Sequence, residues 1–155
     1  MAKQEDSELV SNRRAFHEYE VLDTYEAGIV LLGTEVKSLR AHGGSLQDSY
    51  ILVALNNEVI LKNASIAPYK FGNVYNHEEK RERKLLLHKR EAFILKQQAQ
   101  EKGLTLIPLS MYLRKGIIKV KIGVAKGKKN YDKREALKSR EHQRDMDRAL
   151  KGGYE

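Results

Sequence analysis

The sequence of 155 residues contains no cysteine and no apolar run long enough to cross a bilayer. The absence of cysteine excludes disulfides, thiol catalysis and thiolate metal sites, and it is typical of a reducing cytosol. The first residues are polar and charged and include no apolar stretch of the kind found in secretory signals. The sequence therefore predicts a cytoplasmic protein with no membrane partner.

The composition is strongly basic. The net charge is +8 at pH 7 and the sequence pI is about 9.6, a balance that attracts polyanions. A hydrophobic content of 41% suffices for one modest core in a chain of this length. We expect one domain whose first candidate partner is nucleic acid.

The first folded segment is expected at residues 15–33. Tyr19 and Val21 alternate with acidic residues, a polar break follows at Asp23 and Thr24, and the apolar letters EAGIVLLG come next. This order predicts a hairpin of two short strands. A short helix is then expected over residues 34–40, with Lys37 and Arg40 on its outward face.

Two further hairpins are expected. Residues 49–66 place aliphatic runs on either side of Asn56 and Asn57, and residues 104–125 turn near Gly116. Between these hairpins, residues 76–103 have a helix-forming composition, and Gly103 provides a stop.

The last predicted strand shows the clearest alternation. Every second residue from Ile118 to Val124 is aliphatic, whereas Lys119 and Lys121 fall on the opposite face. Several short antiparallel strands with few helices are typical of a small barrel. The predicted fold is mainly β: a small antiparallel OB-type barrel with peripheral helices.

The two ends of the chain are predicted to lie outside the barrel of residues 13–125. Residues 1–12 are interpreted as a flexible arm, and residues 126–155 as a basic tail that is largely disordered in the free protein. If the tail becomes helical, five cations share about 80° of its surface and could meet phosphate. A solvated helix with i to i+4 ion pairs explains the pattern equally well. The five cations are Lys133, Arg140, Arg144, Arg148 and Lys151.

The sequence shows no motif of an enzyme or of a cofactor site. The letters GVAKGKK lack the spacing and the Ser or Thr of a phosphate-binding loop, and NHEEKRERK lacks the second His of a zinc-protease helix. Acidic residues such as Glu18, Glu20 and Glu26 are expected to face solvent. We therefore expect a non-enzymatic protein without a cofactor or metal. A basic cluster around the letters LLLH is interpreted as a phosphate-contacting patch; its members are Arg81, Arg83, Lys84, Lys89 and Arg90.

Several long motifs occur in a characteristic order: NRRAFHEYE, EAGIVLLGTEVKSLRAHGGSLQDSY, RKLLLHKRE, PLSMYLRKGIIKVKIGVAKGKK and DKRE. From about residue 12 onward the chain closely resembles the bacterial SsrA-binding protein family, also called small protein B. The resemblance implies an OB-type barrel that binds the tRNA-like domain of tmRNA. It further implies delivery of the alanine-charged tmRNA to stalled ribosomes in trans-translation, with elongation factor Tu and alanyl-tRNA synthetase as indirect partners.

The resemblance also implies where the contacts lie, and a monomer is expected. The tail would fold as a helix in the empty message channel near the decoding centre, with a glycine permitting a bend. The tmRNA-facing residues would be Asn12, His17, Glu26, Lys37, Arg40, Arg83, Lys84 and Leu86. The ribosome-facing residues would be Lys126, Gly127, Lys128, Lys129, Tyr131, Asp132, Lys133, Arg134, Arg140, Arg144 and Arg148.

This interpretation has two departures from the family pattern and three alternatives. Tyr131 stands where some members carry His, and Glu78–Glu79 replace the more usual Asp-Pro. A structural ribosomal protein, or a general OB-fold RNA-binding protein, would also combine a basic barrel with a charged tail. An RNA-processing enzyme is disfavoured because the sequence shows no metal-ligand cluster.

Overall fold

The computed structural model describes residues 7–72, 76–101 and 103–128. Most strands join one seven-stranded antiparallel sheet in the order β1-β8-β9-β2-β7-β5-β4, and β3 pairs with β6 separately. The strands are β1 Ser7–Ser11, β2 Tyr19–Ile29, β3 Gly44–Ser45, β4 Tyr50–Val53, β5 Val59–Lys62, β6 Ser65–Ile66, β7 Arg83–Leu86, β8 Leu104–Arg114 and β9 Ile117–Gly127. The helices are α1 Arg13–Glu18, α2 Gly33–Arg40 and α3 Lys89–Gln100.

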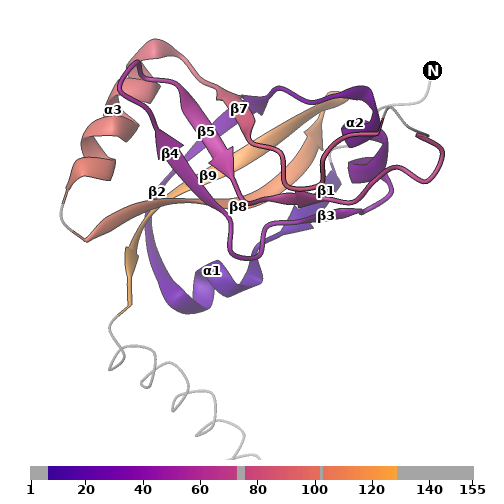
Figure 1. Ribbon diagram of the computed structural model, residues 1–155. Coiled ribbons are helices and arrows are strands. Elements are labelled where there is room, and N and C mark those ends of the chain that lie inside the picture. The colour runs from indigo at the N-terminus through magenta and orange to yellow at the C-terminus, as the bar shows by residue number, and fades with distance from the viewer. Residues whose placement is uncertain (1–6, 73–75, 102, 129–155) are drawn as a thin grey trace, which may run out of the picture.

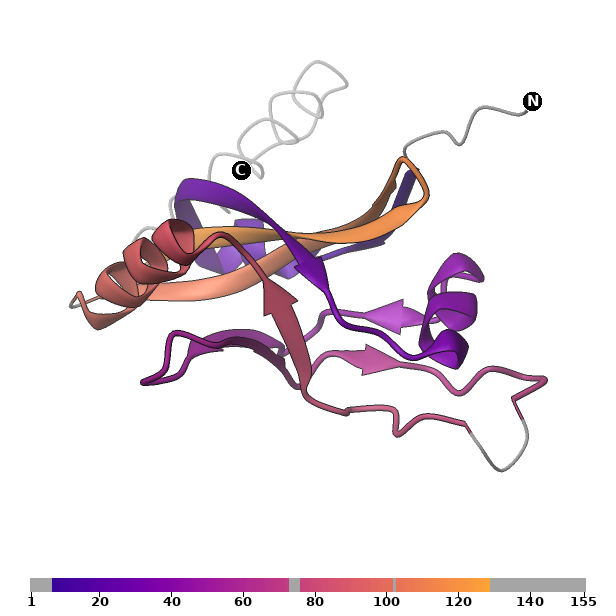
Figure 2. The same cartoon turned by 90° about the horizontal axis from the view of Figure 1, so that it is seen from above.

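The sheet curls on itself, so that its edge strand β4 lies beside β8. Figure 1 shows the strands crossing at the centre, with α1 below them, and Figure 2 shows α2 and α3 at opposite ends. The main core fills the inside of this curl. The prediction of a mainly β, antiparallel, barrel-like fold with peripheral helices is confirmed. No helix in the described part of the chain is long and apolar enough to cross a membrane.

The hairpin of β8 and β9 agrees with the sequence prediction. Lys115 and Gly116 both have positive φ and form its tight turn. The aliphatic residues of the alternating stretch in β9 are at most 6% exposed, whereas Lys121 on the other face is exposed. The predicted turn near Asn57 is also confirmed, because Asn57 has a φ of 65° and links β4 to β5.

The predicted hairpin at residues 15–33 is wrong. Arg13–Glu18 is a helix, and β2 continues from Tyr19 to Ile29 without turning at Asp23 and Thr24. A β-bulge between Val21 and Asp23 absorbs the polar interruption while β2 pairs along β9. A long partner strand thus overrides the local turn signal.

The boundaries of the arm and the tail also differ from the prediction. Ser7–Ser11 is a strand paired with β8, in which Leu9 and Val10 are buried, so this part of the predicted arm belongs to the sheet. At the other end, β9 extends to Gly127, which pairs with Tyr19. The folded unit therefore begins earlier and ends slightly later than residues 13–125.

The predicted helix over residues 76–103 is too long. Arg83–Leu86 forms β7, which pairs with β2 and β5, and α3 begins only at Lys89. Ala92 and Leu95 of this helix are buried, as its apolar spacing suggests. Although the residues of β7 have helical propensity, pairing with β2 on one side and β5 on the other makes them a strand.

Candidate nucleic-acid interface

The carboxylate of Glu26 lies at the centre of the candidate interface. Its Oε2 atom accepts a hydrogen bond from Tyr112 Oη at 2.5 Å and another from Arg114 Nη1 at 2.8 Å. Both donors belong to β8, which is separated from β2 by β9. The side chain is thus held across the sheet surface while 36% of it stays exposed. Both bonds use Oε2, and the carboxylate can accept further hydrogen bonds through Oε1.

Leu86 lies beside Glu26 in one open depression of about 510 Å³. It is the last residue of β7, is opposite Gly28 of β2, and is 52% exposed. A Cβ atom at Gly28 would be in van der Waals contact with Leu86 Cβ at 3.4 Å, so the glycine leaves that space beside Leu86 open. The remaining lining residues are Leu87, His88, Glu91 and Lys119.

Cationic side chains surround the carboxylate. Lys121 is opposite Glu26 in the β2–β9 register, and Arg114 is bonded to it. A second depression next to Glu26 is lined by Tyr112, Arg114 and Lys121, so the carboxylate separates two hollows. On this surface the Glu26 carboxylate can accept hydrogen bonds from a base or ribose, and exposed Leu86 can pack against an unstacked nucleoside. The cationic side chains can bind phosphate.

The Tyr112 hydrogen bond is the main reason that the pKa of Glu26 lies below its ordinary value, and the Arg114 bond lowers the pKa further. Burial and the bond to Glu26 together raise the pKa of Tyr112. The carboxylate therefore stays charged, and remains only an acceptor, to a lower pH than an ordinary Glu.

A Tyr112→Phe variant is expected to raise the pKa of Glu26 toward its ordinary value, because the strongest stabilising donor is lost. An NMR pH titration of the Glu26 side-chain carboxyl carbon measures this change. Tyr50→Phe is the control, because Tyr50 is 46% exposed and lies outside both depressions. An unchanged Glu26 pKa in Tyr112→Phe would show that the hydrogen bond does not act as described.

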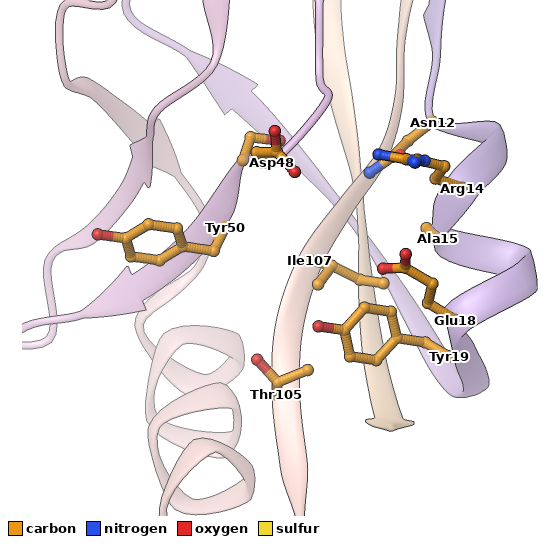
Figure 3. A pocket seen from close by; sticks show the side chains of 10 residues that line it. Asn12, Arg14, Ala15, Glu18, Tyr19, Asp48, Tyr50, Thr105 and Ile107 are labelled. Carbon is orange, nitrogen blue, oxygen red and sulfur yellow. The ribbon is translucent and has the colours of Figure 1, made fainter. Parts of the chain in front are cut away.

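Asn12 lies in a different hollow from Glu26. Figure 3 shows Asn12, with Arg14 and Glu18 of α1, on one side of this hollow, and Asp48 on the other. The Asn12 side chain donates from Nδ2 to the Pro108 carbonyl at 2.8 Å and so fastens the start of α1 to β8. His17 lies in the last turn of α1 and is half-buried. The structure thus brings Glu26 and Leu86 together and places Asn12 in another hollow.

Arg83 is not a surface residue, which corrects its predicted role as an RNA contact. Its side chain is fully buried, and Nε donates to Glu35 Oε2 at 2.7 Å while Nη1 donates to the Ala64 carbonyl at 2.9 Å. Arg81 also donates to Glu35. The predicted phosphate-contacting patch included Arg81 and Arg83. Both of their guanidinium groups are instead bonded to the buried Glu35 carboxylate.

The other predicted basic contributors are exposed. Lys84 projects from β7, where its Nζ lies 3.5 Å from Glu58 Oε1. Lys37 and Arg40 lie on the outward face of α2, as predicted. In the described part of the chain, no group of three or more His, Asp or Glu residues is placed to hold a metal ion.

The start of the predicted ribosome-facing segment belongs to the folded unit. Lys126 and Gly127 complete β9, where Gly127 is opposite Tyr19 of β2. The Lys128 backbone N–H donates to the Glu18 carbonyl at 2.9 Å. The remaining predicted residues lie outside the described part of the chain: Lys129, Tyr131, Asp132, Lys133, Arg134, Arg140, Arg144 and Arg148.

Sequence reasoning missed the partners of Glu26. No motif marks Tyr112 or Arg114 as a partner of Glu26. The available signal was the outward position of each on the strand before the Gly116 turn. Their convergence on Glu26 depends on three adjacent strands and has no local signature.

A comparison with known families finds that the model described as SmpB protein matches residues 9–152. The chain belongs to the SmpB protein family. The SsrA-binding protein of Protochlamydia amoebophila is 59% identical over 149 residues, covering 96% of this chain and 97% of that protein. The SsrA-binding protein of Chlamydia muridarum is 56% identical over 147 residues, covering 95% and 97%.

A solved structure shares the fold of this SmpB family member. It comes from work titled "tmRNA-SmpB: a journey to the center of the bacterial ribosome" and is 47% identical, with a TM-score of 0.67. The match covers 82% of this chain and 92% of that one. Family membership favours the resemblance noted in the sequence over the alternative of a structural ribosomal protein.

Proposed function

We propose that this chain is a tmRNA-binding adaptor of trans-translation. It binds the tRNA-like domain of tmRNA through its folded part and delivers tmRNA to the A site of stalled ribosomes. The C-terminal tail enters the empty message channel near the decoding centre. Family membership and the tmRNA–SmpB structural relative support this assignment.

The proposal rests on one structural observation: Glu26 and Leu86 line the same depression. Oriented carboxylate oxygens accept hydrogen bonds from base amino groups or ribose hydroxyls, and an exposed leucine packs against an unstacked base or sugar. The neighbouring Lys119 supplies positive charge for the RNA backbone. The arrangement suits a folded RNA with exposed loop nucleotides.

The same proposal covers the wider setting. We place the protein in the cytoplasm as an adaptor without catalytic activity. Elongation factor Tu and alanyl-tRNA synthetase act on the tmRNA that it carries and are indirect partners. Lys37, Arg40 and Lys84 are proposed to add long-range attraction for phosphate, while Asn12 positions α1 through its bond to β8.

Glu26→Gln and Leu86→Ala are each expected to weaken binding of the tRNA-like domain of tmRNA by about 10-fold, through loss of a charged acceptor or of apolar packing. A gel-shift titration with the labelled domain measures the affinity. Leu55→Ala is the matched control, because Leu55 is 91% exposed and lines none of the depressions described around Glu26. Unchanged affinity in both variants, with wild-type binding intact, would remove this depression from the interface.

A further inference from the structure

A second surface with nucleic-acid-binding chemistry includes α2 and lines neither of the depressions next to Glu26. We define the basic–aromatic ledge as Lys37, Tyr69, Lys70 and Phe71. The rings of Tyr69 and Phe71 meet edge to face, with centroids 5.6 Å apart and planes at 72°. Lys37 Nζ lies 5.5 Å from the Tyr69 ring centroid, and Lys70 Nζ lies 5.9 Å from that of Phe71. Each ring thus carries a cation within the range of cation–π attraction.

Phe71 is 72% exposed, which is unusual for so large an apolar ring. Its ring therefore adds little to the core, although exposing it to water is unfavourable. Leu32, at the start of α2, is also 49% exposed. The ring offers most of its surface to a ligand.

The backbone beneath the ledge is held firmly. The Asn76 side chain bonds to both backbone groups of Tyr69: Oδ1 accepts from its N–H at 3.0 Å, and Nδ2 donates to its carbonyl at 2.6 Å. The Gly72 N–H donates to the same carbonyl at 2.9 Å. A Cβ atom at Gly72 would lie 2.6 Å from Asn76 Nδ2, so glycine permits this close approach. These bonds hold the backbone on both sides of Lys70 and Phe71, which reduces the backbone entropy lost when a ligand binds there.

The ledge is also joined to the elements that carry the Glu26–Leu86 depression. Ser38 of α2 donates to the Ala67 carbonyl at 2.6 Å. Buried Glu35, also on α2, is paired with Arg83 at the start of β7, the strand that ends at Leu86. These contacts connect the ledge to β7 through α2 within one folded unit.

We propose that the ledge stacks an unpaired base of tmRNA on Phe71, with Lys37 and Lys70 beside the flanking phosphates. Exposed aromatic rings interleaved with cations bind single-stranded or looped nucleotides, because every base has a π-face and every linkage a negative charge. The net charge of +8 favours a polyanion over an apolar protein partner. This inference rests on the proposed tmRNA function and adds a second contact surface to it.

The test compares Phe71→Ala with Phe93→Ala in the full-length protein, using the labelled tRNA-like domain of tmRNA in gel-shift titrations. Phe93 is 52% exposed on α3, at the opposite end of the molecule from α2 (Figure 2), and serves as the matched control. Phe71→Ala is expected to weaken binding about 5- to 30-fold, Phe93→Ala to leave it unchanged, and Phe71→Trp to restore it. Thermal melts check that all variants are folded.

A second measurement locates the contact directly. p-Benzoylphenylalanine at position 71 is expected to crosslink to an unpaired nucleotide of the labelled RNA on irradiation, whereas the same group at position 93 is not. Wild-type affinity in Phe71→Ala, or crosslinking at position 71 to a protein in a reconstituted ribosome mixture and not to RNA, would overturn the ledge proposal. If the wild-type protein itself fails to bind the domain, the proposed function fails instead.

Discussion

An Arg83→Met variant is expected to lose about 3 kcal/mol of unfolding free energy, because it removes the main buried partner of the Glu35 carboxylate. Neither side chain of this ion pair is exposed at all. Arg81 would remain bonded to Glu35, but its own side chain is 30% exposed. Urea denaturation followed by circular dichroism measures the loss.

The geometry explains why the effect is large. Arg83 donates to the carboxylate of Glu35 in α2 and also to the backbone carbonyls of Ala64 and Glu79. Hydrogen bonds from Arg81, the Leu32 backbone N–H and Arg83 outweigh burial, which opposes them, and hold the pKa of Glu35 below its ordinary value. Loss of Arg83 therefore leaves the buried Glu35 carboxylate with Arg81 and the Leu32 N–H as remaining donors, and it removes the Arg83 bonds to the Ala64 and Glu79 carbonyls.

Two controls separate this effect from a general loss of charge. Lys84→Met removes an exposed cation one residue away, whose ion pair with Glu58 is solvent-screened, and we expect a change below about 1 kcal/mol. The double variant Glu35→Leu/Arg83→Met removes both buried charges and is expected to be less destabilised than the sum of the two single variants. Equal stability of Arg83→Met and Lys84→Met would contradict the structural role of Arg83.

Ending the chain after Lys128 is expected to leave affinity for the tRNA-like domain within about threefold of wild type while reducing peptide tagging on stalled ribosomes to background. Glu26, Leu86 and the ledge all precede that point. The retained Lys128 still donates to the Glu18 carbonyl, so the end of β9 stays anchored. Gel-shift titration and an in vitro tagging assay on a message without a stop codon measure the two activities.

The site of truncation matters for this test. Removing residues 127–155 would also delete the Gly127–Tyr19 pair and the Lys128 anchor, and is expected to lower the melting temperature slightly. A full-length control with Lys133, Arg140 and Arg144 changed to Gln separates the charge of the tail from its length. A comparable loss of RNA binding and of tagging in the chain ending at Lys128 would refute a separate role for the tail.

A strand with one buried face and one solvent-facing face could be predicted from the sequence. In β9 the period of two is complete from Ile118 to Val124, because one face packs in the core and Lys119 and Lys121 project from the other. The turns at Asn57 and Gly116 could also be predicted, because both residue types tolerate the positive φ that they adopt, whereas the turn expected at Asp23 and Thr24 does not form. Local chemistry decides such features, and the barrel-like β fold followed from them.

β7 and Arg83 could not be predicted in the same way. The letters RKLL are compatible with a helix, and an arginine within a basic run is typical of a phosphate contact. Only the position of β7 between β2 and β5 makes these residues a strand and places Arg83 against Glu35. The two residues are 48 positions apart, a separation at which pattern analysis detects no pairing.

By itself the sequence determined the basic charge, the antiparallel β character, the turns at Asn57 and Gly116 and the family. The tertiary structure decided which charged groups are available to RNA. Arg83 is buried in the core. Glu26 is hydrogen-bonded by Tyr112 and Arg114 of β8 and lines the same depression as Leu86. The ledge at Phe71 is presented by Asn76 and α2. The physical reason is that composition and periodicity report the chemistry of each residue and its local face. Burial and pairing of charges depend instead on which distant strands the fold brings together.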